Sequence, residues 1–280
     1  MGNYNYRVKT IRSGELVEVE IYPVYTGGKR LPSEKKGETS DSMKKVNQKN
    51  AEKKFIRLVN ANFGKDDLHI TLTHEGELPT KERAEKDVKN FIARIRYRWK
   101  KMGLDPKDMK YIYVMEYRTE EEARKAGRPK IRLHHHLLLS KGLNREMIED
   151  LWQLGGCNTT KLKPNVYGPG LLNIASYLAK DPRGGRRWGA SLNLKKPKVT
   201  ISDTKITRHR AGRMGRDDYE RDRVIQKLYP DCHLLTAYTT YNEINGGTYI
   251  YAELRRRDGY ENLRNETSAM RSRSISVLRT

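Results

Sequence analysis

The chain is long enough for one sizeable domain or two small ones, and it is strongly basic. Its 280 residues include 57 Lys and Arg against 35 Asp and Glu, which gives a net charge of +22, and only 36% of them are hydrophobic. A charge excess of this size favours a polyanionic partner, most commonly nucleic acid, over the alternative of a basic protein without one. No apolar run approaches the ~18 residues of a membrane span, so we expect no membrane partner.

Two further features predict a cytoplasmic location. Residues 1–6 lack the apolar segment that a signal peptide requires. The two cysteines, Cys157 and Cys232, lie far apart in the sequence and have no CxxC partner. We therefore interpret both as free thiols in a reducing compartment, rather than as a disulfide or a zinc site.

The first 54 residues are predicted to form a basic N-terminal arm. Residues 7–25 alternate apolar and polar side chains, as a strand or a hairpin does. Residues 29–53 are rich in lysine and hold few large apolar side chains, which predicts a mobile or helical segment with little core of its own. Apolar residues at helical spacing then follow from 55 to 63.

The central part of the chain predicts a strand, a helix and two more strands. Residues 68–74 alternate cleanly, and residues 82–99 repeat apolar side chains with a period of 3.6 among many basic ones. Residues 111–117 are dense in β-branched and aromatic side chains, which favour strands. Residues 132–139 run from three histidines into an apolar segment, which is typical of a buried strand.

The histidine strand is a candidate metal site. Side chains alternate between the two faces of a strand, so His134 and His136 share one face and His135 points to the other. Two neighbouring imidazoles on a rigid strand can hold a metal ion, whereas the alternative is a core strand that binds none. Antiparallel pairing with residues 111–117 would bring Glu116 toward the pair as a third ligand. The alternative is an exposed carboxylate at a strand end.

A tyrosine on a later helix is a candidate nucleophile. After an amphipathic helix over 144–154, the pattern predicts a second helix over 171–180. There Tyr177 and Lys180 are neighbours at i and i+3, and a nearby ammonium favours the phenolate. With 17 tyrosines in the chain, a surface tyrosine near a lysine is the ordinary alternative.

The segment after this helix is predicted to contact the nucleic-acid backbone, although a solvated basic loop is the alternative. Its candidate residues are cations and one aromatic: Arg183, Arg186, Arg187, Trp188, Lys195 and Lys196. Residues 201–280 then predict a basic C-terminal region. Within it, residues 208–223 form a charged linker or helix, residues 234–254 a β-hairpin, and the remaining tail is loose.

Three separated segments together resemble the rolling-circle replication initiators of plasmids, phages and integrative elements, which are members of the HUH endonuclease superfamily. His134-His135-His136 resembles the superfamily's His-hydrophobic-His motif, with His135 at the usually hydrophobic position. Tyr177-Leu178-Ala179-Lys180 resembles its YxxK motif, and Ile70-Thr71-Leu72-Thr73 looks like its first core strand. Residues 187–197 are similar to a basic segment that follows the tyrosine helix in some initiators.

The resemblance implies an α+β fold in which an antiparallel sheet carries the histidine pair on a central strand and helices flank it. It covers roughly residues 55–200, so we expect an HUH endonuclease domain there, between the N-terminal arm at 1–54 and the C-terminal region at 201–280. The resemblance further implies a bacterial host.

The resemblance also implies a mechanism. His134, His136 and Glu116 would hold Mn²⁺ or Mg²⁺ at the scissile phosphate of single-stranded or hairpin origin DNA. Tyr177 would attack in line, form a 5′-phosphotyrosyl link and release a 3′-hydroxyl primer, and the strand would later be rejoined. Lys180 would stabilise the charge of the transition state. No GxxxxGK[ST] motif occurs, so a host helicase would unwind the duplex and a host DNA polymerase would extend the primer.

Two other classes of function remain open from the sequence. A non-catalytic origin or operator DNA-binding protein would use the histidines structurally and leave DNA intact. A metal-dependent phosphodiesterase would cut with activated water and form no covalent link. Transposases and conjugative relaxases are relatives that share the tyrosine chemistry.

Overall fold

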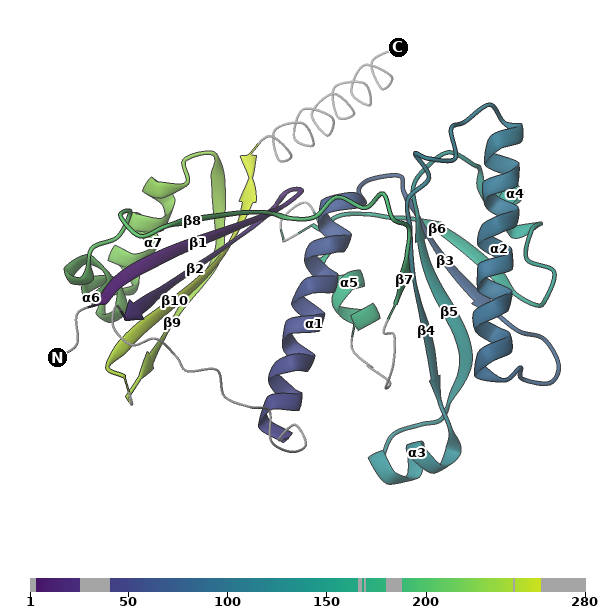
Figure 1. The fold of residues 1–280 in the computed structure, drawn as a ribbon, viewed down its shortest axis with the longest axis horizontal. Coiled ribbons are helices and arrows are strands. Elements are labelled where there is room, and N and C mark those ends of the chain that lie inside the picture. The colour runs from purple at the N-terminus through teal and green to yellow at the C-terminus, as the bar shows by residue number, and fades with distance from the viewer. Residues whose placement is uncertain are drawn as a thin grey trace, which may run out of the picture. The chain divides into compact units, whose positions relative to one another are not determined.

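The computed structural model describes residues 4–25, 41–165, 168, 170–179, 188–243 and 245–257. The fold class is α+β, as predicted, with two five-stranded antiparallel sheets and seven helices in the described part of the chain (Figure 1). The chain divides into two compact units, one drawn from residues 1–46, 165–170 and 196–280 and the other from 47–164 and 171–195. The sequence-based segments 1–54, 55–200 and 201–280 stay a prediction.

The unit of residues 47–164 and 171–195 is built on a sheet whose middle strand is the histidine strand. Its order is β6 (Cys157–Lys161), β3 (Leu68–Thr73), β5 (Ile131–Leu139), β4 (Tyr111–Arg118) and β7 (Gly189–Ala190). Every pairing in it is antiparallel. The central position of β5 and the antiparallel sheet are consistent with the HUH-type fold that the sequence predicts.

The helices α2 (Lys81–Lys101) and α4 (Arg145–Glu149) cover one face of this sheet (Figure 1). The predicted period of α2 is confirmed, because its buried side chains pack with Leu137 and Leu139 of β5 in one core cluster. The helix predicted over 144–154 is shorter in the structure. After Glu149 the chain makes a tighter turn, in which the backbone N–H groups of Leu151 and Trp152 donate to the carbonyls of Ile148 and Glu149. Trp152 then packs in the core and donates its indole N–H to the Thr73 carbonyl at 2.9 Å.

Two other helices, α1 (Asp41–Asn62) and α5 (Leu172–Ala179), lie on the side of this sheet away from α2 (Figure 1). Within residues 47–62, Phe55 packs its ring edge-on against Trp188, with centroids 5.2 Å apart. The Asn60 amide oxygen accepts the backbone N–H of Leu171 at 3.0 Å, just before α5 begins. The second contact attaches the start of α5 to α1. A short helix, α3 (Glu120–Ala126), connects β4 and β5.

The other unit has its own sheet, in the order β8 (Lys198–Ser202), β1 (Tyr4–Ser13), β2 (Leu16–Tyr25), β10 (Gly247–Arg256) and β9 (Cys232–Asn242). The predicted hairpins are the pairs β1–β2 and β9–β10. The helices α6 (Arg208–Arg216) and α7 (Asp218–Leu228) contribute to its core with Met214 and Val224. Among the described residues, no helix is long and apolar enough to span a membrane.

Candidate metal and nucleophile site

The alternation of β5 separates its three histidines in the way the sequence predicts. His135 is fully buried on the side of the sheet that faces the α2 core, where its ring lies 6.0 Å from that of His74. His134 and His136 lie on the other face. The register pairs Glu116 with His134 and Val114 with His136, so β4 delivers the carboxylate to the histidine pair.

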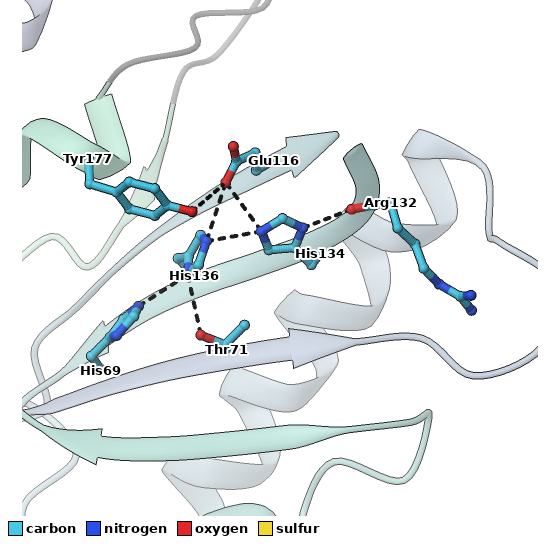
Figure 2. Close-up of polar contacts among 7 residues, drawn as sticks. All are labelled: His69, Thr71, Glu116, Arg132, His134, His136 and Tyr177. Carbon is cyan, nitrogen blue, oxygen red and sulfur yellow. Dashed lines mark hydrogen bonds and ion pairs between the residues drawn. The ribbon is translucent and has the colours of Figure 1, made fainter. Parts of the chain in front are cut away.

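Glu116, His134 and His136 form a tight polar cluster (Figure 2). The Glu116 Oε2 atom lies 3.2 Å from His134 Nε2 and 3.4 Å from His136 Nε2, and the two Nε2 atoms are 3.0 Å apart. In the part of the chain that the structure describes, this is the group of potential ligand atoms gathered closely enough to hold a metal ion.

The outward-facing ring nitrogens have partners that orient the two imidazoles. His134 Nδ1 lies 2.8 Å from the Arg132 carbonyl, which can only accept, so Nδ1 carries a proton. In the neutral ring Nε2 then holds the lone pair, and in the cationic ring Nε2 donates to Glu116 Oε2. His136 Nδ1 lies 3.1 Å from His69 Nε2 and 3.4 Å from Thr71 Oγ1. Ligand imidazoles are usually held in this way through their second nitrogen.

The donor set fits a divalent cation. Two imidazole nitrogens and one carboxylate oxygen converge on one point, and this combination suits Mn²⁺ well and Mg²⁺ when water and phosphate oxygens complete the shell. The cluster is therefore a possible metal-binding group.

Tyr177 extends from α5 to the same cluster. Its hydroxyl donates to Glu116 Oε2 at 3.4 Å, and its ring stands edge-on to that of His136, with centroids 5.5 Å apart at 81°. Tyr177 is 48% exposed, so the residue is open to solvent. The structure thus brings the candidate nucleophile and the candidate ligands together.

The comparison with protein families covers this same segment. Residues 67–182 match the family of the replication-associated protein ORF2/G2P. The match supports a replication initiator. The matched residues run from β3 through α5 and include the whole cluster around Glu116. No curated protein and no solved structure gives a significant match. A match to a replication-associated family agrees with the basic composition of the chain, which favours a nucleic-acid partner.

Electrostatics within this matched segment favour an ionised carboxylate. Hydrogen bonds from His134 and His136 hold the pKa of Glu116 well below its usual range. The hydrogen bond to Glu116 raises the pKa of His134, although burial of the ring acts in the opposite direction. Burial, with the neighbouring His136, lowers the pKa of His69 to about 4, so His69 is neutral at physiological pH.

Burial first, and the Glu116 carboxylate second, raise the pKa of Tyr177. In this arrangement the tyrosine is a phenol that donates a hydrogen bond, and its ionisation requires added positive charge at the cluster. Lys180, which the sequence predicts for that task, lies outside the described residues.

The predicted DNA-contact residues are only partly described. Arg183, Arg186 and Arg187 lie outside the described residues. Trp188 is half-buried against Phe55, so its ring supports α1. Lys195 and Lys196 are exposed, and the backbone of Lys195 is held by the Asn62 side chain at 2.7 and 2.8 Å. Their contact with DNA stays a prediction.

Sequence reasoning gave no role to His69 and Thr71, although both border the site. A signal was present, because both belong to the polar face of the alternating strand β3. The antiparallel register places Thr71 opposite His136 and His69 opposite Leu138, on the face that carries the cluster.

Proposed function

We propose that the protein is a metal-dependent, site-specific single-strand DNA endonuclease and strand transferase of the HUH type that initiates rolling-circle replication. One observation carries the proposal. The Tyr177 hydroxyl and the two histidine Nε2 atoms all contact the same oxygen, Glu116 Oε2, so a nucleophile and a metal-binding group share one point. The family match over 67–182 supports a role in replication.

His134, His136 and Glu116 would hold the metal ion. When bound, a divalent cation would withdraw electron density from the scissile phosphate and offset its charge. The protein's contribution is orientation, since the Arg132 carbonyl and the His69 ring direct the two Nε2 atoms inward.

Tyr177 performs the covalent step. Its phenolic oxygen bonds to the phosphorus while the bond from phosphorus to the 3′ oxygen breaks, which leaves a 5′-phosphotyrosyl link and a free 3′-hydroxyl. The phenolic proton passes to solvent as the bond to phosphorus forms, because the depressed pKa of Glu116 makes that carboxylate a poor proton acceptor, and the departing 3′ oxygen takes a proton from solvent. Attack by a 3′-hydroxyl on the phosphotyrosine reverses the step and rejoins the strand. Lys180 would stabilise the charge that develops on the phosphate.

The substrate is single-stranded or hairpin origin DNA, and the host supplies the helicase and the polymerase. The chain has no GxxxxGK[ST] nucleotide-binding motif, so it depends on a partner for unwinding. The proposed setting is the cytoplasm of a bacterial host.

The test is covalent capture of DNA. A single-stranded oligonucleotide carrying the origin hairpin of the same element, labelled at its 3′ end, is incubated with the protein and Mn²⁺ and separated under denaturing conditions. The label is expected to migrate with the protein, because the 5′-phosphate of the downstream fragment stays on Tyr177. Cleavage with no adduct would assign the protein as a hydrolytic phosphodiesterase, and intact DNA in a stable complex would make it a non-catalytic origin-binding protein.

A further inference from the structure

The connection between β4 and β5 forms a shallow basic groove. Its lining, which we call the α3 groove, consists of Glu120, Ala123, Arg124, Arg128, Pro129 and Lys130, with Gly127 at the turn. The three cations against one carboxylate leave a net charge of +2. No large apolar side chain lines it, so the groove offers charge and no hydrophobic anchor.

The α3 groove lies near Glu116, His134 and His136, at the same end of the sheet. The last pair between the two strands is Arg118 with Ile131, directly beside α3. Glu116 is two residues from that end of β4, a distance of ~7 Å at ~3.3 Å per strand residue. Figure 1 shows α3 beyond this end of β4 and β5. If a DNA strand places its scissile phosphate at Glu116 and His134, phosphates only a few nucleotides away along the same strand can therefore reach the groove.

The groove cations are available for a ligand. The other charges of α3 are already used, because Lys125 pairs with Glu121 at 2.6 Å and Glu122 accepts the backbone N–H of Thr119 at 2.8 Å. By contrast, Arg124, Arg128 and Lys130 are exposed, and no described carboxylate forms an ion pair with them. Exposed unpaired cations that converge on one groove are suited to phosphate groups.

The backbone that carries these cations is already ordered. Thr119 and Glu122 form a reciprocal capping box at the start of α3, and Gly127 ends the helix in the left-handed conformation at φ 58°. The Arg118 guanidinium donates to the Pro129 carbonyl at 2.9 Å, which attaches the returning chain to β4. A ligand that binds here does not have to order the loop, so less binding energy is lost to conformational entropy.

We propose that the α3 groove binds the sugar-phosphate backbone of single-stranded DNA that flanks the scissile phosphate. This inference deepens the proposed function and rests on it for the identity of the strand. Three cations and the absence of an apolar anchor favour a phosphate backbone over a protein segment, which would need hydrophobic contacts. The groove thereby positions the strand for Tyr177 without contacting the reacting atoms.

The test compares two full-length variants that remove equal charge. The groove variant is Arg124→Gln, Arg128→Gln and Lys130→Gln. The control variant is Lys125→Gln, Arg98→Gln and Lys101→Gln, which changes the ion-paired neighbour on α3 and two exposed cations of α2. Binding of a fluorescent random-sequence 30-nucleotide single strand is measured by anisotropy in EDTA at several salt concentrations, so that neither metal nor cleavage contributes.

The groove variant is expected to bind at least ~10-fold more weakly at 0.1 M salt and to show a salt slope shallower by about 2, as three lost phosphate contacts require. The control variant is expected to keep the wild-type slope. Equal losses in both variants would show that net charge alone is responsible and would overturn the groove assignment. Wild-type binding by the groove variant would overturn it as well.

A second measurement separates this inference from the proposed function. In the origin-hairpin nicking assay with Mn²⁺, the groove variant is expected to raise KM and to keep kcat within about threefold, because it affects strand capture and not the Tyr177 chemistry. A lowered kcat with unchanged KM would overturn the positioning role. If the wild-type protein forms no adduct at all, the proposed function fails, while the anisotropy comparison still decides whether the groove binds DNA.

Discussion

At the scale of single residues, the shared contact at Glu116 Oε2 makes Tyr177 the critical test of the mechanism. Tyr177→Phe keeps the ring that packs against His136 and deletes the hydroxyl that contacts Glu116. We expect the variant to bind Mn²⁺ and DNA like the wild type and to lose nicked product and covalent adduct by more than ~10³-fold. Denaturing gels of labelled origin hairpin measure both products.

Near wild-type nicking by the Phe variant would reject Tyr177 as the nucleophile. Nicking that persists without an adduct would instead show attack by water. Tyr97→Phe, which changes an exposed tyrosine on α2, is the matched control and is expected to leave both products unchanged.

If His134 is a metal ligand as proposed, protons are expected to compete with the metal ion for it. Its hydrogen bond to Glu116 raises the pKa above the ordinary value of about 6.5, and a metal ion must displace that proton from Nε2. The affinity for Mn²⁺ is therefore expected to rise as the pH rises through the pKa of His134 and then to level off, with a slope of up to about tenfold per pH unit. Calorimetric titration at pH 6, 7 and 8 measures it, and affinity that falls over this interval would contradict the ligand assignment.

His69 is expected to act as a positioning residue for the ligand His136. Its neutral ring lies 3.1 Å from His136 Nδ1 and stacks on His136 with centroids 5.2 Å apart. His69→Phe keeps the stacking and removes the acceptor, so we expect Mn²⁺ affinity to fall by about 10-fold or more. His69→Gln restores an acceptor and is expected to recover most of the loss. Equal affinities for the Phe variant and the wild type would show that His136 is oriented by other contacts.

At the scale of elements, a substitution of His135 tests the alternation of side chains between the two faces of β5. Both of its ring nitrogens are buried without a hydrogen-bond partner among the described residues, and burial lowers its pKa to about 3. His135→Leu replaces an unsatisfied polar ring with an apolar side chain. We expect unchanged Mn²⁺ affinity and a free energy of unfolding that is equal or higher by about 1 kcal/mol, measured by urea denaturation. Loss of metal binding here, with none on His134→Ala, would show that the side-chain facing of β5 is wrong.

The packing of elements also explains how the tyrosine reaches Glu116 and the two histidines. The register of β4 against β5 delivers Glu116, and the contact of Asn60 with Leu171 attaches the start of α5 to α1. Tyr177 is then one and a half turns into α5. The proposed nucleophile is thus carried by a packed helix, which holds its position better than a loop does.

At the scale of the whole molecule, the net charge of +22 predicts binding to single-stranded DNA that depends steeply on salt. Four or more phosphate contacts at about −0.7 each give a log–log slope near −3 or steeper. Arg186→Ala with Arg187→Ala is expected to weaken binding across all sequences and to leave Mn²⁺ affinity unchanged. Anisotropy titrations at several salt concentrations measure the slope, and a flat dependence would refute binding through the DNA backbone.

The sequence by itself determined the elements around the site and the residues worth testing. A period of 2 in β3 and β5 and a period of 3.6 in α2 are local patterns. They show which side chains share a face of each element, even when the elements that pack against it are unknown. The separation of His135 from its two neighbours follows from that alternation alone. The antiparallel approach of Glu116 also followed from the sequence, because β4 and β5 are consecutive strands with a short connection.

Only the tertiary structure decided which distant segments meet. Strands β1 and β2 pair with β8 and β10 in one sheet, and no local pattern encodes a pairing across more than 180 residues. The roles of His69 and of the α3 groove depend on register between strands and on how a connection packs. The resemblance to the YxxK motif singled out Tyr177 among 17 tyrosines, but only the packing of α5 placed its hydroxyl 3.4 Å from Glu116. Register and packing are long-range properties, because their energies depend on residues far apart in the chain.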